Sequence, residues 1–138
     1  MKEETITSET YQEIYTGLGY LFYSIAAVDG RVQPTEAAKL KELVNKDWVP
    51  LEGSRDELGT DAAYYIEFSF DDANDQVMRP EVAFARFKTT YEANKALFDA
   101  SLRELTFGTA QAIASAFARH NKSELGQLAQ LSLLFNKV

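Results

Sequence analysis

This chain of 138 residues contains no cysteine, only three prolines and a single histidine. Without cysteine it has no disulfide, no thiolate nucleophile and no cysteine-ligated zinc or iron–sulfur site. No nucleophile is recognisable as a partner for His120, so the sequence predicts a protein that is not an enzyme. Gly17 and Gly19 follow no strand and precede no Lys-Ser/Thr pair, so they form no phosphate-binding loop, and we expect no cofactor.

Long apolar runs are absent too. No stretch approaches the roughly 20 apolar residues that span a bilayer, and the start MKEETITSET is polar and acidic, unlike a secretory signal. We therefore expect no membrane span and a cytoplasmic location.

Basic residues are scarce. The chain has 14 Lys and Arg against 21 Asp and Glu, a formal net charge of −7. Binding to nucleic acid depends on neutralising phosphates with basic side chains, so we expect no nucleic-acid partner. Cations or basic partner surfaces fit this charge better. The alternative is that the charge only keeps a small protein soluble.

What the chain does have is helical periodicity, with 46% apolar residues in a length that suits one domain, residues 1–138. A stripe from Ile14 to Val28 predicts one long helix, and Thr10 with Glu13 has capping-box spacing near its start. Similar stripes follow Pro34, Pro80 and Asn121, and another runs from Phe98 to Ala116. Gly108 is a position at which that last stretch can bend or split.

The middle of the chain is ambiguous. Ser54 and Glu57 have capping-box spacing, so a third helix is expected from there toward Phe70. Residues 64–70 also alternate in the manner of a strand, but a lone strand would leave its backbone groups unpaired, which favours a helix. Asp71–Asp75 is expected to form an acidic turn, which fails the spacing of a calcium loop.

The stripes predict an all-α fold, a single compact multi-helix bundle. They also predict one shared core. Its expected members are Leu18, Leu21, Phe22, Ile25, Leu40, Leu43, Leu102, Leu105, Ile113, Leu128 and Leu131.

The stretch from Ile25 to Leu43, IAAVDGRVQPTEAAKLKEL, holds a helix end, a turn and a new helix start. Gly30 can end a helix, and Pro34 with Glu36 suits the first turn of the next. The stretch resembles the TerB-like (tellurite-resistance B) helical domain family, whose sequences often read A-x-A-D-G, then a few residues, then Glu. The resemblance implies two related helix-turn-helix halves, and a weak repeat, E-x3-L-x2-L from Glu36 and from Glu124, falls where such halves would place it.

The resemblance also implies an acidic cluster between the halves. Asp29 and Glu36 match the first half and Glu124 matches the second, but Arg119-His120-Asn121 stands where the second Asp-Gly would be. Two carboxylates at adjoining helix ends can hold a divalent cation. The alternative is that Asp29 caps a helix and Glu36 serves the helix dipole. Whether any metal binds is left open.

Two functions follow as hypotheses. The first is a non-catalytic interaction module that binds an unknown protein partner, for which the resemblance implies a stress-response context. Its partner surface is expected near Tyr11, Tyr15 and the Asp71–Asp75 turn, because tyrosine is enriched at interfaces. Ordinary core packing of these rings is the alternative. The second function is a small metal- or ligand-binding protein that uses an acidic cleft at Asp29 and Glu36.

Overall fold

A computed structural model describes residues 8–28, 32–49, 61–116 and 122–136. This part of the chain forms an all-α bundle of six α-helices with short 3₁₀ and π-helical turns, and it contains no strand. The helices are α1 (Ser8–Ala26), α2 (Pro34–Leu43), α3 (Tyr65–Gln76), α4 (Pro80–Ala93), α5 (Ala100–Ala116) and α6 (Lys122–Asn136).

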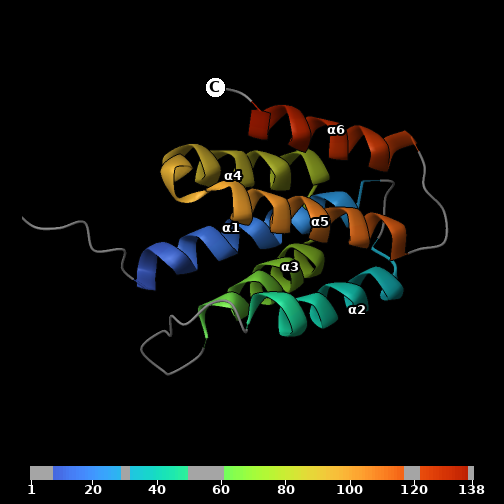
Figure 1. The fold of residues 1–138 in the computed structure, drawn as a ribbon. Coiled ribbons are helices and arrows are strands. Elements are labelled where there is room, and N and C mark those ends of the chain that lie inside the picture. The colour runs from blue at the N-terminus through green and yellow to red at the C-terminus, as the bar shows by residue number, and fades with distance from the viewer. Residues whose placement is uncertain (1–7, 29–31, 50–60, 117–121, 137–138) are drawn as a thin grey trace, which may run out of the picture.

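α1 runs through the middle of the bundle (Figure 1). It packs most extensively against α3 on one side and α4 on the other, and it also contacts α5 and α6. α5 contacts α2 and α6, so it links the two outer ends of the arrangement. A helix surrounded in this way needs an unusually wide apolar surface, which the sequence of α1 supplies.

The predicted stripe of α1 is confirmed. Leu18, Leu21, Phe22 and Ile25 are all fully buried. They join a core that includes buried residues of all the other helices, among them Leu40, Phe70, Phe87, Ile113 and Leu131.

Two glycines let neighbouring helices approach α1 closely. A Cβ added to Gly17 would lie 2.8 Å from the Cβ of Thr90 on α4. A Cβ added to Gly19 would overlap the hydroxyl of Ser69 and the backbone carbonyl of Ile66, both on α3. The Ser69 hydroxyl is held there because it donates to the carbonyl of Tyr65 at 2.9 Å. These contacts explain why two residues that weaken helices lie inside α1.

α2 begins at Pro34, as predicted. The chain then continues into a π-helical turn, η1 (Val44–Trp48), which brings Trp48 into the core. Its ring packs edge-on against Phe22, with centroids 6.2 Å apart, and its Nε1 donates to Thr109 Oγ1 of α5 at 3.1 Å. Trp48 therefore anchors this helical turn in the core.

Residues 64–70 are helical, which settles the helix-or-strand alternative. A 3₁₀ turn, η2 (Ala62–Tyr64), leads directly into α3. The Asp61 carboxylate caps this turn by accepting from the backbone N–H of Ala63 at 2.9 Å. The expected cap at Ser54 and Glu57 lies outside the described residues.

The prediction of an acidic turn at Asp71–Asp75 is wrong, because these residues continue α3 to Gln76. One face of this segment still supports the core, since Ala73 is fully buried. The helix ends instead at Val77, which has a left-handed conformation with φ 53°. That conformation is strained for a β-branched residue. It brings the carbonyl of Met78 to the hydroxyl of Tyr23 on α1, which donates to it at 2.7 Å.

The second half of the described chain contains α4, α5 and α6. Gly108 lies inside α5, which continues through it as one helix. α5 begins at Ala100 rather than Phe98, and the Asp99 carboxylate accepts from the N–H of Leu102 at 2.9 Å. Phe98 instead joins a cluster of aromatic rings that holds the end of α6 against α4: Phe87, Tyr91, Phe98 and Phe135.

Eight of the eleven expected core residues are buried, while Leu43, Leu102 and Leu105 are half-buried. Leu102 and Leu105 lie on the side of α5 that packs against the edge of the core. The relation between two helix-turn-helix halves stays a prediction, because the turn expected between Ala116 and Lys122 lies outside the described residues.

Candidate functional site

The expected acidic cluster is described only at Glu36. Asp29 lies outside the described residues, and so does the side chain of Glu124, whose backbone is in α6. Glu36 is 1% exposed, and its Oε1 accepts from the backbone N–H of Gln33 at 2.8 Å. This carboxylate is the third-residue partner of a capping box at the start of α2. Glu36, a predicted metal ligand, therefore already stabilises the start of α2 as part of its N-terminal cap.

The structure corrects the placement of Tyr15 on an open partner surface. Tyr15 is 6% exposed and packs edge-on against Trp48, with ring centroids 6.0 Å apart. Tyr11 is half-buried and stacks on Tyr15 at 6.2 Å. Both positions lie on the stripe side of α1, one turn apart, so burying that stripe carries Tyr15 into the core.

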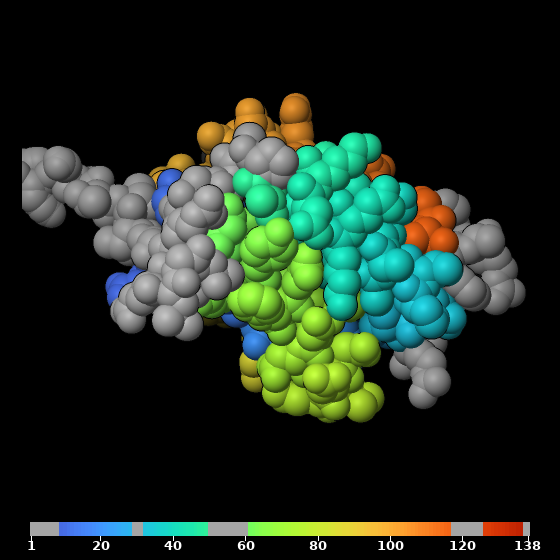
Figure 2. Space-filling model, turned by 90° about the horizontal axis from the view of Figure 1, so that it is seen from below, coloured from blue at the N-terminus to red at the C-terminus, as the bar shows by residue number. Residues whose placement is uncertain are grey.

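The carboxyl group of Glu67 on α3 has a raised pKa. Burial raises the pKa of Glu67 on α3, the charge of Asp71 adds to the rise, and Lys41 on α2 opposes it. Lys41 also pairs with Asp71 at 3.7 Å, across the face that α2 and α3 both form in Figure 2. Lys41 and Asp71 thus form an ion pair between α2 and α3 beside the Glu67 carboxyl group.

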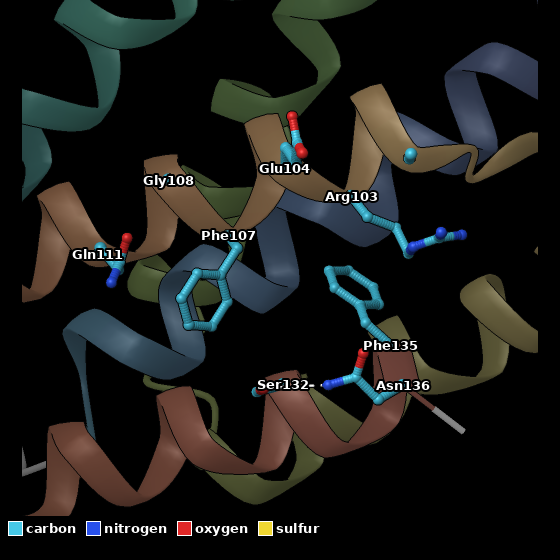
Figure 3. A pocket seen from close by; sticks show the side chains of 9 residues that line it. Arg103, Glu104, Phe107, Gly108, Gln111, Ser132, Phe135 and Asn136 are labelled. Carbon is cyan, nitrogen blue, oxygen red and sulfur yellow. Dashed lines mark hydrogen bonds between the residues drawn. The ribbon is translucent and has the colours of Figure 1, made fainter. Parts of the chain in front are cut away.

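A first groove lies between α5 and α6 and has a volume of about 370 Å³. The rings of Phe107 and Phe135 point into it, as Figure 3 shows. Arg103 lines one end, and its Nη1 donates to the carbonyl of Phe98 at 2.5 Å. On the α6 side, Asn136 donates to Ser132 Oγ at 3.5 Å. The groove is thus apolar with a polar border, and its one cation already has a partner.

A second groove is larger, about 550 Å³, and its floor is α1 from Glu9 to Tyr20. One wall is α4, which contributes Arg86, Thr89 and Thr90, and the other side carries Tyr65 of α3. Because α3 and α4 both pack on α1, the groove between them follows the axis of α1. We call it the α1 groove.

The two ends of the α1 groove differ in charge. Glu9 and Glu13 are exposed at the end nearest the start of α1. At the other end the Arg86 guanidinium lies over the ring of Tyr20, 5.1 Å from its centroid, and Nη1 donates to the Tyr20 hydroxyl at 3.3 Å. The one cation that lines this groove is therefore held against an aromatic ring.

An exposed aromatic side chain continues the apolar part of this surface. Phe68 on α3 is 51% exposed, and its ring lies 5.3 Å from that of Tyr65. The sequence signal for an exposed ring here is the crowding of aromatic residues, since residues 64–70 carry more aromatic side chains than one buried helix face can hold. Sequence reasoning placed the partner surface at Tyr11 and Tyr15 because it could not tell which side of α1 is covered.

The chemistry available to these sites is limited. In the described part of the chain, no three Asp, Glu, His or Cys side chains gather closely enough to hold a metal ion. None of the described helices is long and apolar enough to cross a membrane.

Comparisons with protein-family models, curated proteins and solved structures found no match for this chain, so the TerB-like resemblance stays a prediction.

Proposed function

We propose that this protein is a non-catalytic interaction module of the TerB-like kind, which binds a protein partner in a stress-response setting. The observation that carries the proposal is the α1 groove together with the exposed ring of Phe68. Interfaces are enriched in aromatic side chains that are accessible before binding and buried afterwards. A half-exposed phenylalanine beside a groove of about 550 Å³ has this character.

The alternative of a metal- or ligand-binding protein at Asp29 and Glu36 has less support. A cation ligand needs accessible lone pairs, and the Glu36 carboxylate is buried and accepts a backbone hydrogen bond. No described observation favours that function over the first.

The proposal is tested with two variants, one beside the α1 groove and one inside it. Phe68→Ser removes the exposed ring, and Thr89→Trp fills the groove from α4. Each has a matched control: Leu133→Ser removes an apolar side chain that is 71% exposed on α6, and Ala85→Trp puts the same ring on an exposed position of α4 that does not line the groove.

Proteins captured from an extract of the source cells by the unaltered chain are identified, purified and measured by calorimetry. We expect Phe68→Ser and Thr89→Trp each to weaken binding of the true partner about ten-fold, the usual effect of losing an interface anchor, and both controls to bind normally. A partner lost equally in the controls, or no partner whose binding depends on the groove, contradicts the proposal.

A further inference from the structure

The α1 groove has a length and a distribution of charge that define the kind of segment it can bind. We propose that it binds a basic amphipathic helix of a partner protein. This inference rests on the proposed function, since it names the chemistry of the partner at the same groove.

The length of the groove comes from its floor. Glu9 and Tyr20 are eleven residues apart on one helix, which is about 16 Å along the axis. Three turns of a bound helix cover that distance. Such a helix lies between α3 and α4 and buries one apolar side against the rings of Tyr20 and Tyr65. An amphipathic helix that lies in a groove between other helices is a recurrent mode of recognition.

The charge of the partner follows from the two ends. Glu9 and Glu13 offer carboxylates at one end, and Glu13 Oε2 accepts a hydrogen bond from Asn94 at 3.3 Å, which ties it to the end of α4. At the other end, the guanidinium of Arg86 lies over the ring of Tyr20 and donates a hydrogen bond to its hydroxyl. Lysine or arginine side chains near one end of the bound helix would therefore meet two carboxylates, while the one cation among the lining residues, Arg86, lies at the other end against Tyr20.

The overall charge favours the same partner. At −7, the chain attracts basic segments from a distance and repels acidic ones. A second copy of this chain would bring the same net negative charge to the groove, so self-association there is disfavoured. The aromatic rings add specificity, because Phe68 and Tyr65 can hold the apolar side of the helix or the stem of a lysine side chain.

The probe is a synthetic peptide of about 18 residues, long enough to form a helix on its own, with lysines on one face and leucines on the other. A scrambled peptide of the same composition has no apolar face, and a third peptide has glutamate in place of each lysine. Binding to the full chain is measured by fluorescence anisotropy at low and at physiological salt. We expect the amphipathic lysine peptide to bind at least ten-fold more tightly than either of the other two.

Two double variants separate the groove from the overall charge. Glu9→Gln with Glu13→Gln removes two charges inside the groove, and Glu42→Gln with Glu104→Gln removes two exposed charges outside it. We expect the first pair to weaken peptide binding about ten-fold at low salt, with a smaller effect at higher salt, and the second pair to have little effect. Thr89→Trp should abolish binding, while Ala85→Trp should not.

Several results would overturn the inference. Equal effects of the two double variants, or equal binding of the scrambled peptide, would mean that the overall negative charge alone attracts basic chains. Tighter binding of the glutamate peptide, or no binding of any peptide, would exclude a basic helix. A native partner that depends on Phe68 and Thr89 but not on Glu9 and Glu13 would keep the proposed function and reject only this inference.

Discussion

α1 meets α3 through small side chains, whereas α5 meets α6 beside large aromatic ones, and the two contacts leave very different amounts of space. At the first contact, Gly19 lies against Ser69 so closely that a single added methyl group would overlap it. At the second, Gly108 has nothing within 4 Å of the position of an added Cβ, and a groove of about 370 Å³ remains. Glycine therefore has opposite roles in two helices of one bundle: in α1 it allows close packing, and in α5 it only weakens the helix.

The largest expected effect tests the close contact directly. Gly19→Ala should lower the free energy of unfolding by about 3 kcal/mol, the upper end for an overpacked core. The reason is that one of the overlapping atoms, the carbonyl oxygen of Ile66, belongs to the backbone of α3 and has no flexible end that can turn aside. Urea denaturation measures the change. If Gly19→Ala and Gly108→Ala cost the same, the contrast between the two contacts is refuted.

The buried side of α5 allows a second comparison, between a threonine with a hydrogen-bond partner and one with none among the described residues. Thr106 and Thr109 are both buried and lie three residues apart. Thr109 accepts from Trp48 Nε1, so Thr109→Val should cost about 1–3 kcal/mol by leaving a buried donor unpaired. Thr106 Oγ1 has no hydrogen-bond partner among the described residues, so Thr106→Val should leave stability unchanged or raise it by up to about 1 kcal/mol.

Both threonine variants can be followed by the fluorescence of Trp48, the one tryptophan of the chain. The emission of the Thr109 variant should also shift in the folded state, because its indole N–H has lost its acceptor. Equal losses of stability in the two variants would show that the Thr106 hydroxyl has a partner as well.

The turn at the end of α3, which contacts α1, requires a strained backbone conformation. Val77 is strained by its left-handed conformation, and the turn that it makes brings Met78 to Tyr23. Val77→Gly should raise the free energy of unfolding by about 1 kcal/mol, since strain of this kind is worth about 1–3 kcal/mol and glycine loses more entropy on folding. Val77→Ala keeps the Cβ and serves as the control. A larger gain for alanine than for glycine would mean that exposure of the valine side chain, not strain, is the cost.

The smallest expected effect lies at the open contact. Gly108→Ala should stabilise the protein by about 0.5–1 kcal/mol, because the added methyl group meets no other atom and alanine favours the helix. Gly126→Ala on α6 should behave in the same way, since it too has open space around it. Thermal unfolding of both variants checks this. If either alanine variant were less stable than the unaltered protein, α5 and α6 would have to lie closer together than the groove between them implies.

Much of the fold could be predicted from the sequence, and the failures have a common cause. Pro34 and Pro80 marked helix starts correctly, because a residue with fixed φ and no N–H acts locally. The acidic residues 71–75 misled the prediction, because polarity alone does not end a helix that has a buried residue such as Ala73 on its inner face. Gly108 does not split α5, since one glycine weakens a helix without breaking it.

The candidate site was less predictable. Their chemistry makes Glu36 and Tyr15 candidate site residues, but Glu36 takes part in a helix cap and Tyr15 packs in the core. The crowding of aromatic residues at 64–70 indicates that a ring stays exposed there, but nothing local identifies Phe68 as that ring, or Thr89 as part of a groove. The α1 groove consists of residues up to about 80 positions apart along the chain, and no spacing rule connects them.

The sequence by itself determined that this chain is helical, acidic and free of cysteine chemistry, because periodicity, capping residues and net charge act over a few residues or over the whole composition. Only the tertiary structure decided which sides of the helices are covered. That depends on how closely α3 and α4 can approach α1, which is set at Gly17 and Gly19 by atoms of Thr90, Ser69 and Ile66. A close approach between helices that are far apart in sequence leaves no local signal, so the grooves appear only when the helices are packed.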